Sequence, residues 1–217
     1  MTDIFREVDE DLRRDQAIVL WRKYGRFAIA FGIAAVIATA GFVGWQNYRE
    51  TRRDAAARSY AQGMEFVVKN DVAAAAAAMA DLSGGSSAYR PLALLQEAAL
   101  EAKVGKQAQA AAIYDHLAAD DSADQAFRDL ATILSAMIGL DGSDPASIEK
   151  KLQPLTAEGQ PFRPSALELL GYVAVKQGDF KAAKTRFRAI ADDMTAPTGL
   201  RKRATQVLAW IGDKGGT

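Results

Sequence analysis

The segment 165–197, SALELLGYVAVKQGDFKAAKTRFRAIADDMTAP, determines how the C-terminal part of the chain folds. Its apolar residues recur with helical spacing on both sides of Gly178, so the pattern predicts two α-helices joined by a tight turn. Small residues at Gly171 and Ala183 would let the two helices approach closely, and Phe187 would fill the space toward the next hairpin. The segment therefore predicts a helical hairpin.

This hairpin resembles a tetratricopeptide repeat, whose pattern is W-x2-L-G-x2-Y…A-x3-F…P. Leu170-Gly171, Ala183 and Phe187 fall at the spacing of that pattern, and Leu167 stands in the place of the tryptophan. The resemblance implies a stack of similar hairpins, because one such hairpin cannot bury its apolar face alone.

Similar turns recur through the chain after residue 49, at Asn70, Gly105, Gly142 and Gly178, at intervals of roughly 36 residues. This part is rich in Ala, Leu, Glu and Lys, which favours helices. The expected fold class is all-α, with one N-terminal transmembrane helix and a tetratricopeptide-like right-handed solenoid of about four helical hairpins. The segment 200–211 is expected to close the solenoid.

The other hairpins repeat the pattern more weakly. The third needs one extra residue, and Asp144-Pro145 is expected to cap its second helix. The residues expected to pack between helices are Gly63, Ala75, Met79 and Leu82 around Asn70, Leu94, Ala98, Ala110, Tyr114 and Leu117 around Gly105, and Ile148, Leu152 and Leu155 after Gly142.

Residues 27–48, FAIAFGIAAVIATAGFVGWQNY, form an uncharged run flanked by Arg and Lys on both sides. As a helix the run covers roughly 33 Å, close to the thickness of a bilayer core. Trp21 and Tyr24 suit one membrane interface, and Trp45 and Tyr48 suit the other. The sequence predicts a single transmembrane span, surrounded by lipid.

Two alternatives compete with the span. The small residues Ala38-Thr39-Ala40 resemble a cleavage site for a signal peptidase, but the preceding segment is long and rich in acids, unlike a signal peptide. An unusually apolar core helix is the other alternative, although core helices of small soluble domains rarely stay uncharged over this length.

The composition argues against several classes of function. The 217 residues carry no formal net charge, which gives no reason to expect a nucleic-acid partner, and the cluster Arg201-Lys202-Arg203 is expected to be a solvated helix face. The chain has no cysteine, which excludes disulfides, thiol catalysis and thiolate metal sites.

Candidate catalytic chemistry is sparse. His116 is the only histidine, so neither a multi-histidine metal site nor a site needing two histidines is possible. We therefore expect that the protein is not an enzyme, that it uses no cofactor or metal, and that it has no small-molecule substrate.

Two surfaces are candidates for protein partners. The first helix of each hairpin should line the concave face of the solenoid, so Tyr60, Met64, Leu95 and Tyr172 are expected to form an apolar partner groove. Core packing is the alternative role for each of them. In the span, Ala30, Ala34, Gly41 and Gly44 lie near one helical stripe that could contact another transmembrane helix.

The whole chain resembles the ancillary SecYEG translocon subunit family (YfgM-like). The resemblance rests on DIFREVDEDLRRDQ, on WRKYGRF before the span, on GWQNYRE at its end, and on the alanine-rich hairpins. It implies a cytoplasmic tail at 1–26, a transmembrane helix at 27–48 in the cell inner membrane, and a periplasmic tetratricopeptide-like domain at 49–217. The family supplies this orientation, because the flanking charges are nearly balanced.

The resemblance also implies partners. It implies a membrane-anchored adaptor that binds proteins at the Sec translocon and links it to periplasmic chaperones. The alternatives are a scaffold for cell-envelope or division machinery and, from another class, a membrane-bound hydrolase of the envelope, for which the sequence offers only scattered carboxylates.

Overall fold

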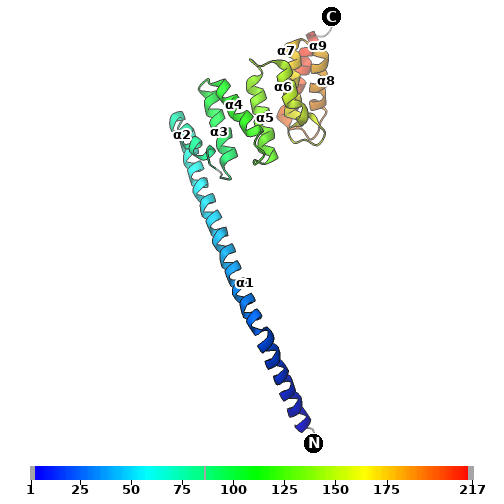
Figure 1. Cartoon of the computed structure of the whole chain (residues 1–217). Coiled ribbons are helices and arrows are strands. Elements are labelled where there is room, and N and C mark those ends of the chain that lie inside the picture. Colours follow the sequence, from blue (N-terminus) through cyan, green and yellow to red (C-terminus); the bar gives the residue numbers. More distant parts are fainter. Residues whose placement is uncertain (1–2, 86, 215–217) are drawn as a thin grey trace. The chain divides into compact units, whose positions relative to one another are not determined.

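The computed structural model describes residues 3–85 and 87–214, and this part of the chain is built of helices (Figure 1). Met1, Thr2, Ser86 and residues 215–217 lie outside the described residues. Contacts divide the chain into two units, 1–55 and 56–217. The all-α class expected from the sequence is confirmed.

Helix α1, Asp3–Val68, begins in the first unit, and its last turns belong to the second. The helix is long because its sequence contains no proline and is rich in alanine. The second unit continues with the following helices: α2 Val72–Ser83, α3 Arg90–Lys103, α4 Gln107–Ala118, α5 Gln125–Gly139, α6 Pro145–Leu152 with the 3₁₀ turn η1 Gln153–Thr156, α7 Arg163–Gln177, α8 Phe180–Ala191 and α9 Thr198–Lys214.

These helices form the four predicted hairpins and a closing helix. The hairpins are the end of α1 with α2, then α3/α4, α5/α6 and α7/α8. From α2 onward each helix packs on its neighbour in the chain, and α3, α5 and α7 also contact the next helix but one. Such nearest-neighbour packing defines a solenoid of stacked repeats.

Left-handed turn residues and aspartate caps set the hairpin boundaries. Asn70, Gly105 and Gly178 have φ angles of 58°, 84° and 76°, which glycine and asparagine tolerate best. The carboxylates of Asp71 and Asp179 accept hydrogen bonds from backbone N–H groups three residues later, 3.1 and 2.9 Å away, and so cap α2 and α8.

The turn at Gly142 differs from the other three. Its backbone is not left-handed; instead the N–H of Ser143 donates to the carbonyl of Gly139 at 2.8 Å. Asp144 then caps α6 by accepting from the N–H of Ser147 at 3.2 Å, and Pro145 occupies the first turn. The cap predicted at Asp144-Pro145 is therefore confirmed, within a different kind of turn.

Close helix contacts occur where the sequence places small residues. A Cβ at Gly171 would lie 2.7 Å from Cε2 and Cζ of Phe187, which is fully buried. A Cβ at Gly63 would lie 2.5 Å from Cε of Met79, another fully buried side chain. The helices within both hairpins thus approach each other closely at these glycines.

Four apolar clusters follow one another along the solenoid. The packing residues expected in the first three hairpins lie in them, except Gly63 and Ala110, which are buried but belong to no cluster. In the second hairpin, Leu94, Ala98, Ala110, Tyr114 and Leu117 are all buried. The last cluster is covered by α9, where Ile211 is fully buried and Val207 and Leu208 are partly buried against it. The predicted closing helix is therefore confirmed.

Candidate membrane segment and partner-binding surface

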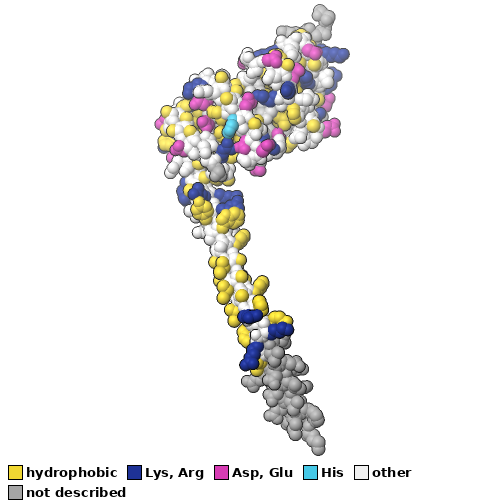
Figure 2. Space-filling view, in the orientation of Figure 1, with side chains coloured by type: hydrophobic (Ala, Val, Ile, Leu, Met, Phe, Trp, Pro, Cys, Tyr) yellow, Lys and Arg dark blue, Asp and Glu magenta, His cyan; other side chains and the backbone are white. Residues whose placement is uncertain are grey.

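The apolar part of α1 is long and apolar enough to be a candidate membrane span, and none of it is buried within the chain. Figure 2 shows its hydrophobic side chains bounded at both ends by Lys and Arg. At one end the Arg26 guanidinium lies 4.9 Å from the ring centre of Phe27. At the other, Arg49 lies 4.6 Å from Trp45 and Arg52 lies 5.0 Å from Tyr48. Such pairs of basic and aromatic side chains suit membrane interfaces.

The stripe of small residues in the candidate span is exposed. Ala30, Ala34, Gly41 and Gly44 are all exposed, and a Cβ added at Gly41 or Gly44 meets no other atom of the described chain within 4 Å. A second helix could therefore approach this side of α1 closely. Its role as a helix contact stays a prediction.

The predicted groove residues are half-buried and belong to three different clusters. Tyr60 and Met64 pack against the first cluster, and the Tyr60 ring lies 5.6 Å from that of Tyr89. Leu95 packs against the second cluster, and Tyr172 against the last. Their burial shows that they take part in packing, and the exposed part of each side chain stays available for the predicted groove.

Tyr172 lies beside an ion pair whose carboxylate is buried and whose arginine is exposed. Its ring packs edge-on against Phe187 at 5.3 Å, and burial raises the pKa of its hydroxyl, with a further contribution from Glu168. Glu168 is only 8% exposed and accepts two hydrogen bonds from Arg203, at 2.7 and 3.0 Å. Beside Tyr172 the predicted groove would therefore be charged, because Glu168 and Arg203 meet there.

The basic cluster predicted as a solvated face is largely solvated. Lys202 and Arg203 are exposed, although Arg203 also binds Glu168, and Arg201 is half-buried. The prediction is therefore confirmed for Lys202 and Arg203 and only partly for Arg201. Sequence reasoning missed the pair Glu168–Arg203, since its members come from separate elements.

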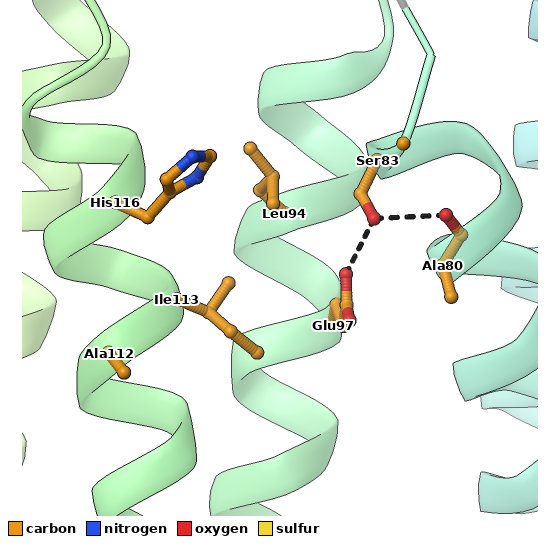
Figure 3. Close-up of a pocket in the computed structure, with 8 residues that line it drawn as sticks. Ala80, Ser83, Leu94, Glu97, Ala112, Ile113 and His116 are labelled. Carbon is orange, nitrogen blue, oxygen red and sulfur yellow. Dashed lines mark hydrogen bonds between the residues drawn. The ribbon is translucent and has the colours of Figure 1, made fainter.

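A shallow depression of about 470 Å³ lies between α2, α3 and α4. Figure 3 shows Ile113 and His116 on one side of it and Ser83 on the other. The Ser83 hydroxyl lies 2.7 Å from Oε2 of Glu97 and 3.1 Å from the carbonyl oxygen of Ala80. Because the carboxylate and the hydroxyl already satisfy each other, the depression offers few polar groups to a ligand.

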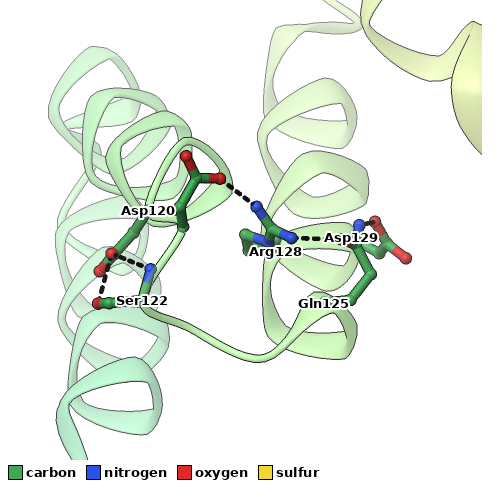
Figure 4. Close-up of polar contacts among 6 residues, drawn as sticks. Asp120, Ser122, Gln125, Arg128 and Asp129 are labelled. Carbon is green, nitrogen blue, oxygen red and sulfur yellow. Dashed lines mark hydrogen bonds and ion pairs between the residues drawn. The ribbon is translucent and has the colours of Figure 1, made fainter.

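The loop after α4 holds the most strongly perturbed carboxylate. Asp120 accepts from the N–H and hydroxyl of Ser122 and pairs with Arg90, and these contacts lower its pKa to about 2. Figure 4 shows this loop beside Arg128 of α5. Arg90 also donates to the carbonyl of Ser83, so this side chain of α3 links the end of α2 to the loop after α4. These contacts hold neighbouring helices of the stack together.

No group of three or more His, Cys, Asp or Glu that could hold a metal ion occurs among the described residues. The polar contacts described above join one hairpin to the next.

Comparison with known proteins agrees with this architecture. The profile of the tetratricopeptide repeat-like domain family matches residues 19–208, which include both the candidate span and the hairpins. No curated protein and no solved structure gave a significant match.

Proposed function

The chain belongs to the tetratricopeptide repeat-like domain family, and from this premise we propose that it is a membrane-anchored adaptor that holds protein partners next to a membrane complex. Members of such repeat families typically serve as protein-interaction scaffolds, which favours binding over catalysis. One observation supports the proposal above all. A single family match includes both an unburied apolar helix and a stack of helical hairpins.

We further propose residues 1–26 as a cytoplasmic tail, 27–48 as the span in the inner membrane, and 49–217 as a periplasmic domain. The resemblance to the ancillary translocon subunit family supports this orientation, with SecYEG and periplasmic chaperones as partners. A scaffold for envelope or division machinery would share the same architecture, because repeat folds alone do not specify a partner.

Site-specific photocrosslinking in native membranes tests the proposal. A photoreactive residue at Ala34 probes the small-residue stripe, and Val43, on the opposite side of the helix, is its control. A second probe at Tyr60 examines the groove, with exposed Gln109 of α4 as its control. We expect translocon subunits to crosslink at Ala34 and Tyr60 more strongly than at the two controls.

Identification of the crosslinked partners separates the alternatives. Recovery of translocon subunits and chaperones supports the adaptor, and exclusive recovery of cell-wall enzymes would overturn it. Equal crosslinking at test and control positions would show that neither proposed surface is the binding face.

A further inference from the structure

The solenoid contains a longer internal repeat. Residues 89–124, YRPLALLQEAALEAKVGKQAQAAAIYDHLAADDSAD, align without a gap on 162–197, FRPSALELLGYVAVKQGDFKAAKTRFRAIADDMTAP. The alignment continues from α5, QAFRDLATILSAMIG, to α9, TGLRKRATQVLAWIG. Each half of this repeat is a hairpin followed by one further helix.

Equivalent contacts confirm the alignment in three dimensions. Arg90 donates to the carbonyl of Ser83 and pairs with Asp120. Arg163, its equivalent, donates to the carbonyl of Thr156 and approaches Asp193 at 4.0 Å. The two halves can therefore be compared residue by residue.

The two halves differ at an arginine near the start of the last helix. In the first half, Nη1 of Arg128 binds the carboxylate of Asp121, and Nη2 binds the side-chain oxygen of Gln125 (Figure 4). In the second half, Met194 stands in the place of Asp121, and the equivalent arginine is Arg201. The first half thus shows that a carboxylate fits against this arginine.

Arg201 lacks such a partner among the described residues. Its Nη1 reaches only the sulfur of Met194, at 3.5 Å, a weak acceptor. Its Nε is buried and has no hydrogen-bond partner within the described chain, as is also true of Nε of Arg128. A carboxylate at Nη1 of Arg201, placed as Asp121 is against Arg128, would replace the weak sulfur contact by a charge-assisted hydrogen bond.

Met194 adds an apolar contact beside the arginine. It is 78% exposed in the loop between α8 and α9. Methionine is a flexible side chain that adapts to the surface it contacts. We propose that Arg201 and Met194 form a binding site for a protein segment that presents an Asp or Glu carboxylate next to an apolar residue. This inference rests on the proposed adaptor function and specifies the chemistry of one of its partners.

Met194→Asp is the decisive variant, because it rebuilds the pair of the first half and should fill the site from within the chain. Panning a phage-displayed library of random peptides on the full-length protein in detergent micelles provides the probe. We expect peptides that bind the wild type to be enriched in Asp and Glu, and to bind Met194→Asp about tenfold more weakly or worse.

Control variants distinguish binding at this site from a general effect of added negative charge. Gln206→Glu adds the same charge at an exposed position on another face of α9 and should leave binding unchanged. Replacing the acid of a selected peptide by its amide should weaken binding to the wild type but not to Arg201→Gln, and circular dichroism of each variant confirms that it is folded. Equal loss in Gln206→Glu and Met194→Asp would overturn the site.

The peptide experiment tests the carboxylate site and the crosslinking experiment tests the adaptor function, so either proposal can be refuted while the other stands. If the library yields no peptides, or peptides without acid enrichment, the carboxylate site is wrong, whatever partners crosslinking recovers. If acidic peptides require Arg201 while crosslinking recovers only cell-wall enzymes, the carboxylate site stands and the translocon function is wrong.

Discussion

Replacing Gly171 by alanine tests the close packing within the last hairpin. The added methyl would lie 2.7 Å from two ring carbons of Phe187 and 3.2 Å from a third. The Phe187 ring is fully buried and packed edge-on by Tyr172, so it has little room to move away. The substitution therefore forces a clash that the neighbours cannot easily relieve.

Two effects of opposite sign determine the magnitude. Alanine is favoured over glycine in a helix interior by about 1 kcal/mol. Overpacking a dense core costs about 1 to 3 kcal/mol. We expect Gly171→Ala to lower the free energy of unfolding by about 1 kcal/mol net, and the Tm by roughly 2 to 4 °C for a chain of this size.

Two matched glycine variants isolate the clash. Gly63→Ala meets Cε of Met79 at 2.5 Å, but this is the end of a flexible side chain that can turn away, so we expect a nearly neutral effect. Gly212 has no atom of the described chain within 4 Å of an added Cβ, so Gly212→Ala should stabilise the protein by up to about 1 kcal/mol.

Thermal unfolding of the full-length protein in detergent, followed by circular dichroism, measures all three variants. The expected order of Tm is Gly212→Ala highest, Gly63→Ala close to wild type, and Gly171→Ala lowest. A Gly171→Ala protein that is stabilised as much as Gly212→Ala would refute the close approach of α7 and α8.

Three further outcomes are expected. Val36→Arg should reduce membrane insertion by about 3 kcal/mol, measured as the fraction of chains integrated into microsomes, and unimpaired insertion would place the span elsewhere. Phe187→Ala should cost about 3 to 5 kcal/mol of stability and Tyr172→Ala about 1, since Tyr172 is only half-buried; equal losses in urea unfolding would contradict the assigned register. Asp120 has a pKa lowered from 3.8 to about 2, so its stabilising contribution is present above pH 3.8 and lost as the pH falls toward 2. As the pH falls from 3.8 toward 2, the free energy of unfolding should therefore decrease less for Asp120→Asn than for the wild type. Parallel profiles of unfolding free energy against pH would show that the contact contributes nothing.

Much of the fold could be predicted from the sequence because it depends on local patterns. Helical spacing and turn residues define each hairpin within a few dozen residues, and aspartates cap α2, α6 and α8. The small residue at Gly171 and the aromatic ring at Phe187 indicate their own contact, since the hairpin brings nearby segments together. The long apolar run likewise identifies a candidate span through length and composition alone.

Contacts between hairpins were decided by the tertiary structure. The buried Glu168 pairs with the exposed Arg203 only because α9 stacks on α7, and neither residue signals the other in the sequence. The difference between Arg128 and Arg201 likewise became visible once the equivalent loops could be compared, because each arginine is defined by what the neighbouring loop places against it. Local periodicity specifies a helix and its turn, whereas the rotation of one hairpin against the next determines which side chains meet.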